Sequence, residues 1–182
     1  MERRRLITML EVAVMAGAGG LFSVLLALKL WPQGGSVSLA MVPVVLVAFR
    51  RGWVAGLLCG LLVGLINLIM NPFIVHPVQV VLDYPLAYSV LGLAGCFRLN
   101  RDIPATSLTG RVALGVTVAG LARLLSHFIS GVIWFGAFAP EGFSPALYSL
   151  LYNASYIVPE ILISIAVTLL LALKAPELVR RK

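Results

Sequence analysis

Charged side chains are scarce in this chain of 182 residues: they make up 12% of it, whereas hydrophobic types make up 60%. A soluble domain averages about 25% charged and about 45–50% apolar residues. This balance excludes a water-soluble globule and predicts that most of the chain lies in a lipid bilayer. The net charge of +7 does not indicate a nucleic-acid partner, because the basic residues cluster at the ends of apolar runs, beside an anionic membrane surface.

Cysteine and histidine are also rare, and the motifs of several enzyme classes are missing. Cys59 and Cys96 lie in apolar stretches without metal-ligand spacing, so neither a disulfide framework nor a metal site is indicated. Two histidines and no H-E-x-x-H motif leave little for a metalloenzyme, and no G-x-S-x-G accompanies the serines. The phosphate-binding loop G-x-x-x-x-G-K-[ST] is absent as well. We therefore expect no enzymatic activity, no ATP hydrolysis by this chain itself and no cofactor.

Long apolar runs fill the space between the charged, proline and glycine clusters. Because a spanning helix needs about 20 mostly apolar residues, the sequence predicts an all-α integral membrane protein, a single domain over residues 1–182 with six transmembrane helices. The spans are expected at residues 6–30, 37–49, 52–71, 77–97, 111–135 and 147–173. The second is short, rising only about 20 Å at about 1.5 Å per residue, and it contains Pro43. Irregular backbone buried in protein would have to complete that crossing.

The basic residues predict an orientation for this bundle. With six spans and a cytoplasmic N-terminus, twelve of the fourteen Lys and Arg residues fall on the cytoplasmic side. The two exceptions are Lys29, at the outer end of the first span, and Arg123, inside the fifth. Because cytoplasmic loops are enriched in Lys and Arg, both termini are expected in the cytoplasm.

Several polar and aromatic side chains interrupt the spans at a similar depth. At the helical rise, Asp83, His127 and Asn153 lie in the outer half of the membrane, with Trp134 and Tyr148 at its rim. Polar residues in hydrocarbon are costly and usually face a bundle interior. The layer indicates a pocket, open to the outside, for a small, flat, cationic molecule attracted by aromatic faces and a carboxylate. The alternative is that these groups only link helices or form an interfacial belt.

Other charged residues in the spans have a structural interpretation. Arg123 and Glu160 fall at the same depth, so we expect a mutual buried ion pair. Glu11, near the inner end of the first span, is expected to pair with the Arg3–Arg5 cluster or with a partner protein.

Small residues recur every four positions in two spans and favour close helix packing. In the third span the repeat consists of Gly52, Gly56, Gly60 and Gly64, and it is expected to pack within the bundle. In the first span the small residues indicate either internal packing or contact with a partner subunit. They are Ala13, Ala16, Gly17 and Gly20.

Eight ordered motifs run from about Gly34 to Glu160. They are G-G-S-V-S-L at 34–39, M-V-P at 41–43, R-R-G at 50–52, H-P-V-Q at 76–79, L-D-Y-P-L-A at 82–87, S-H-F-I-S-G at 126–131, A-P-E-G at 139–142 and Y-S-L-L-Y-N at 148–153. In these motifs the chain resembles the thiamine-specific substrate-binding subunits of energy-coupling factor (ECF) transporters. The resemblance implies a six-helix subunit of the bacterial cytoplasmic membrane that captures thiamine from outside. It also implies that transport requires a transmembrane coupling protein and two ATPases.

The resemblance further implies roles for individual residues. Asp83 is expected to hydrogen-bond the aminopyrimidine of the vitamin, with Tyr84 beside it, and Trp31 lies in the loop expected to close over the ligand. The other positions that match pocket residues of the family are His127, Trp134, Tyr148 and Asn153.

The sequence departs from the family pattern at three places. Asp83 stands where the family generally has Glu, and the pair Trp134-Phe135 leaves open which ring stacks on the ligand. Ala13 with Gly17 is a near match to the Ala-x-x-x-Ala motif with which such subunits contact the coupling protein. The alternatives are a subunit for a related vitamin or thiamine precursor, an intramembrane enzyme, or an assembly scaffold.

Overall fold

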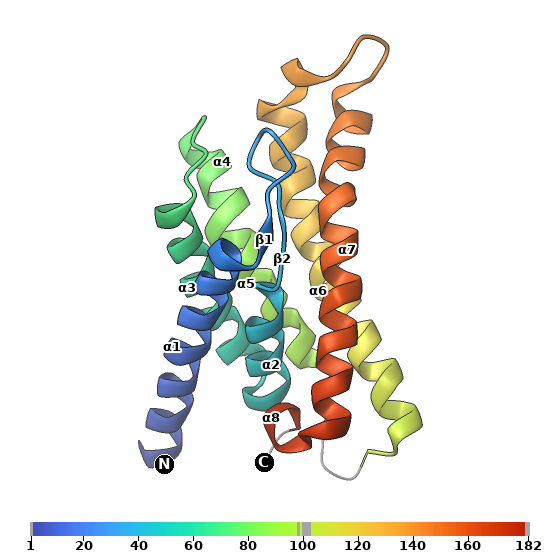
Figure 1. Cartoon of the computed structure of the whole chain (residues 1–182). Helices are drawn as coiled ribbons and strands as arrows, with labels where there is room; N and C mark the ends of the chain where they lie inside the picture. Colours follow the sequence, from blue (N-terminus) through green and yellow to red (C-terminus); the bar gives the residue numbers. More distant parts are fainter. Residues whose placement is uncertain (1, 98, 100–102, 181–182) are drawn as a thin grey trace.

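The computed structural model describes residues 2–97, 99 and 103–180, and in this part the protein is an all-α bundle with one small β-hairpin. Figure 1 shows long helices side by side, with both ends of the chain at the same end of the bundle. The elements are α1 (Glu2–Leu25), β1 (Ala27–Leu28), β2 (Val37–Ser38), α2 (Met41–Arg51), α3 (Trp53–Met70), α4 (Pro77–Val81), the π-helix η1 (Leu82–Leu86), α5 (Ala87–Ser89), the 3₁₀-helix η2 (Val90–Cys96), α6 (Ala105–Trp134), the 3₁₀-helix η3 (Gly136–Phe138), α7 (Pro145–Lys174) and α8 (Pro176–Val179).

Among the described residues, five segments are long and apolar enough to cross a membrane. They are α1, α3, the continuous segment 77–96, α6 from Ser107 onward, and α7. These segments coincide with five of the six predicted spans. The first is shorter than predicted and ends at Leu25, because Ala27 and Leu28 pair with Ser38 and Val37 in an antiparallel hairpin.

The remaining predicted span, residues 37–49, is not one long helix. Its first residues form β2, and α2 has 11 residues, which rise about 16 Å at about 1.5 Å per residue. Every residue from Met41 to Phe49 is buried, so α2 is a core helix enclosed by the bundle. Pro43 lies in its first turn, where a missing N–H breaks no helical hydrogen bond. The helix ends at Arg51 and is followed by Gly52, whose φ of 97° is unfavourable for other residues.

Three glycines of the predicted repeat, Gly56, Gly60 and Gly64, pack inside the bundle as predicted, whereas Gly52 precedes α3 and has nothing within 4 Å of a Cβ built on it. A Cβ on Gly60 would collide with the carbonyl oxygen of Tyr88, and one on Gly64 with that of Tyr84. The backbones of α3 and segment 77–96 are therefore in direct contact.

The π-helix η1 contains Pro85, which has no N–H to donate. The widened turn of a π-helix accommodates the proline without ending the helix.

The small residues of α1 do not share one face. Ala16 is 1% exposed and belongs to the buried core, and a Cβ on Gly20 would lie 2.5 Å from Cγ2 of Ile66 in α3, so both positions face the bundle interior. Ala13 and Gly17 are exposed, and nothing lies within 4 Å of a Cβ built on Gly17. Ala13 and Gly17 thus remain the candidates for contact with a partner.

Glu11 is paired, but with other residues than those expected. Its carboxylate lies 2.5 Å from Nη2 of Arg51 and 3.3 Å from Nε of Arg50. Both arginines end α2, which packs beside α1, so the pairing joins these helices rather than two turns of α1.

Candidate functional site

A cavity of about 300 Å³ lies between the loop that joins β1 and β2, residues 71–73, segment 77–96, α6 and α7. Cavities of about this size or larger commonly hold small-molecule ligands. Its polar side chains include Gln79, Asp83, His127, Ser130 and Asn153. Its aromatic side chains are Trp31, Phe73, Tyr84, Tyr88, Phe135, Tyr148, Tyr152 and Tyr156.

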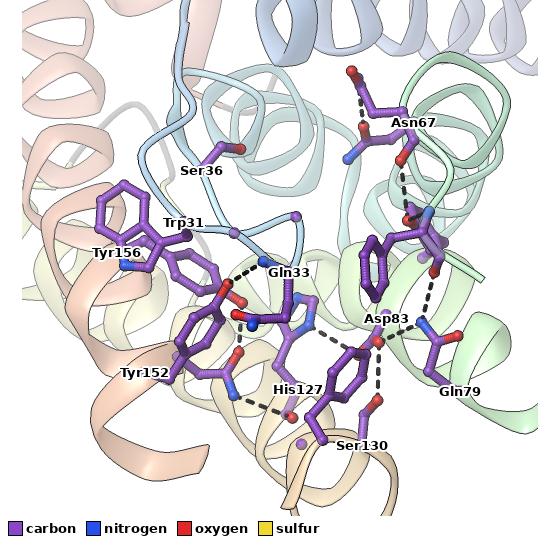
Figure 2. A pocket seen from close by; sticks show the side chains of 18 of the residues that line it. Trp31, Gln33, Ser36, Asn67, Gln79, Asp83, His127, Ser130, Tyr152 and Tyr156 are labelled. Atoms are coloured by element: carbon purple, nitrogen blue, oxygen red, sulfur yellow. Dashed lines mark hydrogen bonds and ion pairs between the residues drawn. The ribbon is translucent and has the colours of Figure 1, made fainter. Parts of the chain in front are cut away.

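Asp83 is the centre of a hydrogen-bonded cluster on the cavity wall (Figure 2). Its Oδ2 accepts from Nε2 of Gln79 at 2.7 Å and from Oγ of Ser130 at 2.9 Å. Its Oδ1 lies 3.0 Å from Nδ1 of His127. Hydrogen bonds to an ionised group are stronger than neutral ones. Donors from segment 77–96 and from α6 therefore hold the carboxylate in one orientation.

His127 lines the cavity, and its second ring nitrogen, Nε2, is buried. Because the Asp83 carboxylate only accepts hydrogen bonds, Nδ1 of His127 carries the proton between them. In a neutral imidazole Nε2 is then an acceptor, and this atom is buried with no hydrogen-bond partner in the described part of the chain. Buried polar atoms are normally paired. His127 is therefore suited to accept a hydrogen bond from an N–H or O–H group of a bound molecule.

Helix α7 supplies the adjoining polar group, Asn153. Its Oδ1 accepts from the hydroxyl of Tyr156 at 2.5 Å, and its Nδ2 donates to the carbonyl oxygen of Ser149 at 2.9 Å. These two bonds fix the amide at the cavity surface, where Asn153 is 6% exposed.

The loop between β1 and β2 lies over the cavity and is tied to α7. Near its tip, Nε1 of Trp31 donates to Oγ of Ser155 at 2.6 Å, and the backbone N–H of Gln33 donates to the Tyr152 hydroxyl at 3.1 Å. Figure 2 shows Gln33 beside Tyr152, and Trp31 beside Tyr156. Each contact joins residues more than a hundred positions apart in the sequence. Together they hold the loop against the aromatic side chains of α7.

At the base of the hairpin, Ser38 is bonded to Glu160, which also pairs with Arg123. Oε1 of Glu160 accepts from both the backbone N–H and the hydroxyl of Ser38, each at 2.7 Å. Its Oε2 forms the ion pair with Arg123, and the two side chains are 0% and 4% exposed, respectively. The predicted buried ion pair is therefore confirmed. Arg123 lines the cavity and lies over the ring of Tyr88, 4.5 Å from its centroid.

The loop from Asn71 to His76 forms another edge of the cavity. The Tyr84 hydroxyl accepts from the N–H of Phe73 at 2.7 Å and donates to the carbonyl oxygen of Asn71 at 3.0 Å. The rings of Phe73 and Phe135 are 5.8 Å apart between centroids, which closes this edge against the end of α6.

The serines of α6 do not form a nucleophile with His127. Oγ of Ser126 donates to the carbonyl oxygen of Leu82 at 2.7 Å, and Oγ of Ser130 donates to Asp83. A serine nucleophile needs its proton directed at the base, and both hydroxyl protons are directed elsewhere.

Comparison with known proteins identifies the family. Residues 9–180 match the model of the family described as thiamine transporter protein. This chain belongs to that family. It is 40% identical to the thiamine transporter ThiT of Bacillus subtilis (strain 168), over 98% of this chain and 97% of the relative. It is 28% identical to ThiT of Lacticaseibacillus paracasei, over 97% and 92% of the two chains.

A solved structure supports the same assignment. The fold is similar to that of ThiT from Listeria monocytogenes, with a TM-score of 0.82 and 27% identity over 97% of this chain and 99% of that one. The family consists of transporters rather than enzymes. With its apolar helices, this member of the thiamine transporter family is a multi-pass membrane protein.

Most of the residues that the sequence predicts for the pocket come together at the cavity of this thiamine transporter family member. Those that line it are Trp31, Asp83, Tyr84, His127, Tyr148 and Asn153. Trp134 is not among the lining residues, whereas Phe135 is. The Trp134 ring stacks instead on His76, with centroids 5.2 Å apart, because residues one position apart at a helix end point in different directions.

Sequence reasoning missed two donors to Asp83. Gln79 precedes Asp83 by four residues, and that spacing places both on one helix face, so it could have been found. Ser130 lies 47 positions from Asp83 and meets it only through the packing of α6 against segment 77–96, which has no local signal.

Proposed function

We propose that this protein binds thiamine from the outside with high affinity, as the substrate-specificity subunit of an ATP-driven ECF vitamin transporter. The observation that carries the proposal is the pairing of Asp83 with His127 in an aromatic cavity beneath the hairpin. Membership in the thiamine transporter family supports the identity of the vitamin.

The chemistry of thiamine suits this cavity. Its aminopyrimidine ring carries an exocyclic amino group, which would donate to Oδ1 of Asp83 and Nε2 of His127, both acceptors. Its thiazolium ring is a permanent cation, and aromatic faces such as that of Trp31 attract cations. Riboflavin and biotin lack this combination of an amino donor and a fixed positive charge. A thiamine precursor would retain only part of it.

We further propose six membrane crossings with both termini in the cytoplasm. Both ends of the chain lie at the same end of the bundle in Figure 1, which supports an even number of crossings. The five long helices would be completed by α2 together with the hairpin before it, whose backbone is enclosed by protein. Twelve of the fourteen basic residues then lie on the cytoplasmic side of the bacterial membrane.

Coupling to ATP hydrolysis is proposed to come from partner proteins, a transmembrane coupling subunit and two ATPases. The sequence has no nucleotide-binding loop, which supports this division of labour. The exposed residues Ala13 and Gly17 of α1 would let a partner helix approach closely.

Tryptophan fluorescence of the purified protein tests the binding proposal. Thiamine should quench it saturably, because Trp31 lies at the cavity. Trp31→Phe should remove most of the change, whereas Trp53→Phe is the matched control, since Trp53 starts α3 and is 50% exposed. Saturable quenching by riboflavin, biotin or a thiamine precursor but not by thiamine would favour the related-vitamin alternative, and no response to any of them would favour a scaffold.

Uptake into sealed vesicles tests the partner proposal separately. The isolated subunit should bind thiamine without accumulating it, and accumulation should appear only with the coupling protein and ATPases. Accumulation by the subunit alone would contradict dependence on partners, and chemical turnover of thiamine would indicate an enzyme.

A further inference from the structure

Gln79 is buried beside the Asp83 carboxylate, and all the polar atoms of its side chain are paired. The residue is 1% exposed. Its Nε2 donates to Oδ2 of Asp83 at 2.7 Å and to the carbonyl oxygen of Phe73 at 3.1 Å. Its Oε1 accepts from the N–H of Val75 at 3.0 Å. Figure 2 shows the side chain reaching from segment 77–96 toward Asp83.

The three partners allow one orientation of the Gln79 amide. The Asp83 carboxylate and the Phe73 carbonyl only accept hydrogen bonds, and the Val75 N–H only donates. A flipped amide would bring oxygen against two acceptors and nitrogen against a donor. Gln79 therefore presents an N–H to Asp83, and it has no donor left for a ligand.

This N–H limits where the carboxylate can point. Oδ2 of Asp83 is held by Gln79 from its own helix and by Ser130 from α6. Oδ1 is thereby left beside His127, on the wall of the cavity. Loss of the Gln79 donor would leave Oδ2 with the Ser130 hydroxyl alone and would free the short side chain to turn.

We propose that Gln79 is a positioning residue that aims the Asp83 carboxylate at the amino donor of the ligand, and so contributes to selectivity for ligands with that donor. The backbone of the loop 71–76 holds Gln79, and Gln79 holds Asp83. The inference rests on the proposed function, since it takes thiamine as the ligand.

Gln79→Met tests the role, because Met has a similar length but no amide. Affinity is measured by calorimetry or competition for thiamine and for oxythiamine, in which oxygen replaces the amino group of the pyrimidine. We expect thiamine to bind about 10-fold more weakly and oxythiamine to change by less than about 2-fold. Equal weakening of both ligands, or no change for thiamine, would overturn the proposal, because a residue that only supports the fold does not distinguish them.

Two further variants keep the test decisive if Gln79→Met folds poorly. Gln79→Glu, with its carboxyl ionised, retains an oxygen for the Val75 N–H but has no donor for Asp83 or for the Phe73 carbonyl, so it should lose selectivity while keeping one of the two loop contacts. Ser130→Ala removes the other donor to Oδ2 without touching the loop and should shift selectivity in the same direction. Preserved selectivity in Gln79→Glu, measured at alkaline pH where the new carboxyl cannot donate a proton to Asp83, would refute the role of Gln79.

A double-mutant cycle checks that Gln79 acts through Asp83. In an Asp83→Asn background, Gln79→Met should change thiamine affinity by less than about 2-fold, since the positioned carboxylate is gone. A full effect in that background would overturn the proposal. Wild-type protein that binds neither thiamine nor oxythiamine would refute the proposed function itself. Wild type that binds thiamine, with Gln79 variants of unchanged selectivity, would refute only this inference.

Discussion

Glu160→Gln should destabilise the protein by more than the loss of one hydrogen bond. Glu160 is 0% exposed, and its partner Arg123 is 4% exposed. Removing one member of a buried ion pair costs about 3–5 kcal/mol, because the other charge stays in a medium that solvates it poorly. The amide oxygen of Gln still accepts from Ser38, so the anchor of the hairpin is largely kept and the loss reports on the charge.

Ser38→Ala measures the hairpin anchor by itself. It removes the hydroxyl bond to Oε1 of Glu160 and the bond that the hydroxyl accepts from the N–H of Ala40 at 3.2 Å, and it keeps the backbone bond to Glu160, so a loss of about 1.5–3 kcal/mol is expected. The free energy of unfolding in detergent micelles, with thermal melting as a check, should therefore fall less for Ser38→Ala than for Glu160→Gln.

The double variant Arg123→Met with Glu160→Leu decides whether the ion pair is the cause. Replacing both members of a buried pair by apolar side chains of similar volume is often neutral or stabilising. The double variant should accordingly be more stable than Glu160→Leu alone, which also removes the acceptor of Ser38 but leaves Arg123 buried without its partner. If Glu160→Gln leaves stability unchanged, or if the double variant is less stable than Glu160→Leu, the assignment of the stability to charge pairing is wrong.

Two further predictions concern binding and coupling. Asp83→Asn should weaken thiamine binding about 10-fold or more in calorimetry without unfolding the bundle, because a hydrogen bond to a charged group contributes about 1.5–3 kcal/mol. Unchanged affinity would remove Asp83 from the site, and tighter binding by Asp83→Glu would show that the shorter side chain underreaches. Gly17→Leu should spare binding but impair complex assembly and uptake, whereas Ala16→Leu should lower the melting temperature, since Ala16 is 1% exposed in the core while nothing lies within 4 Å of a Cβ on Gly17. Similar behaviour of the two variants would contradict the division of α1 into inner and outer faces.

Hydropathy and the helical rise were sufficient to predict the long helices and the meeting of the polar residues at one level of the bundle. The five long spans, and the layer that holds Asp83, His127 and Asn153, depend on quantities that a sequence determines directly, namely segment length and residue number along a helix. The ion pair of Arg123 with Glu160 was predictable for a related reason: charges deep in a membrane need partners, and few are available at one depth.

The hairpin was not predictable, although it covers the cavity. The apolar run continues past Leu25 to Leu30, so hydropathy alone extends the first helix. What bends the chain there is a set of contacts remote in sequence, such as the one between Trp31 and Ser155, 124 positions apart. The same cause explains the partner of Glu11, since Arg51 is brought to it by the packing of α2 beside α1.

The direction of a side chain around its helix was the least predictable feature. One residue along an α-helix turns the side chain by about 100° at 3.6 residues per turn, so depth is nearly unchanged while the facing surface differs. Trp134 and Phe135 are neighbours at the rim, but Phe135 lines the cavity and Trp134 stacks on His76. Likewise Ala16 packs inward and Gly17 outward, although both belong to one small-residue pattern. The packing of the other helices decides which surface each position faces, and no local pattern in a single sequence contains that information.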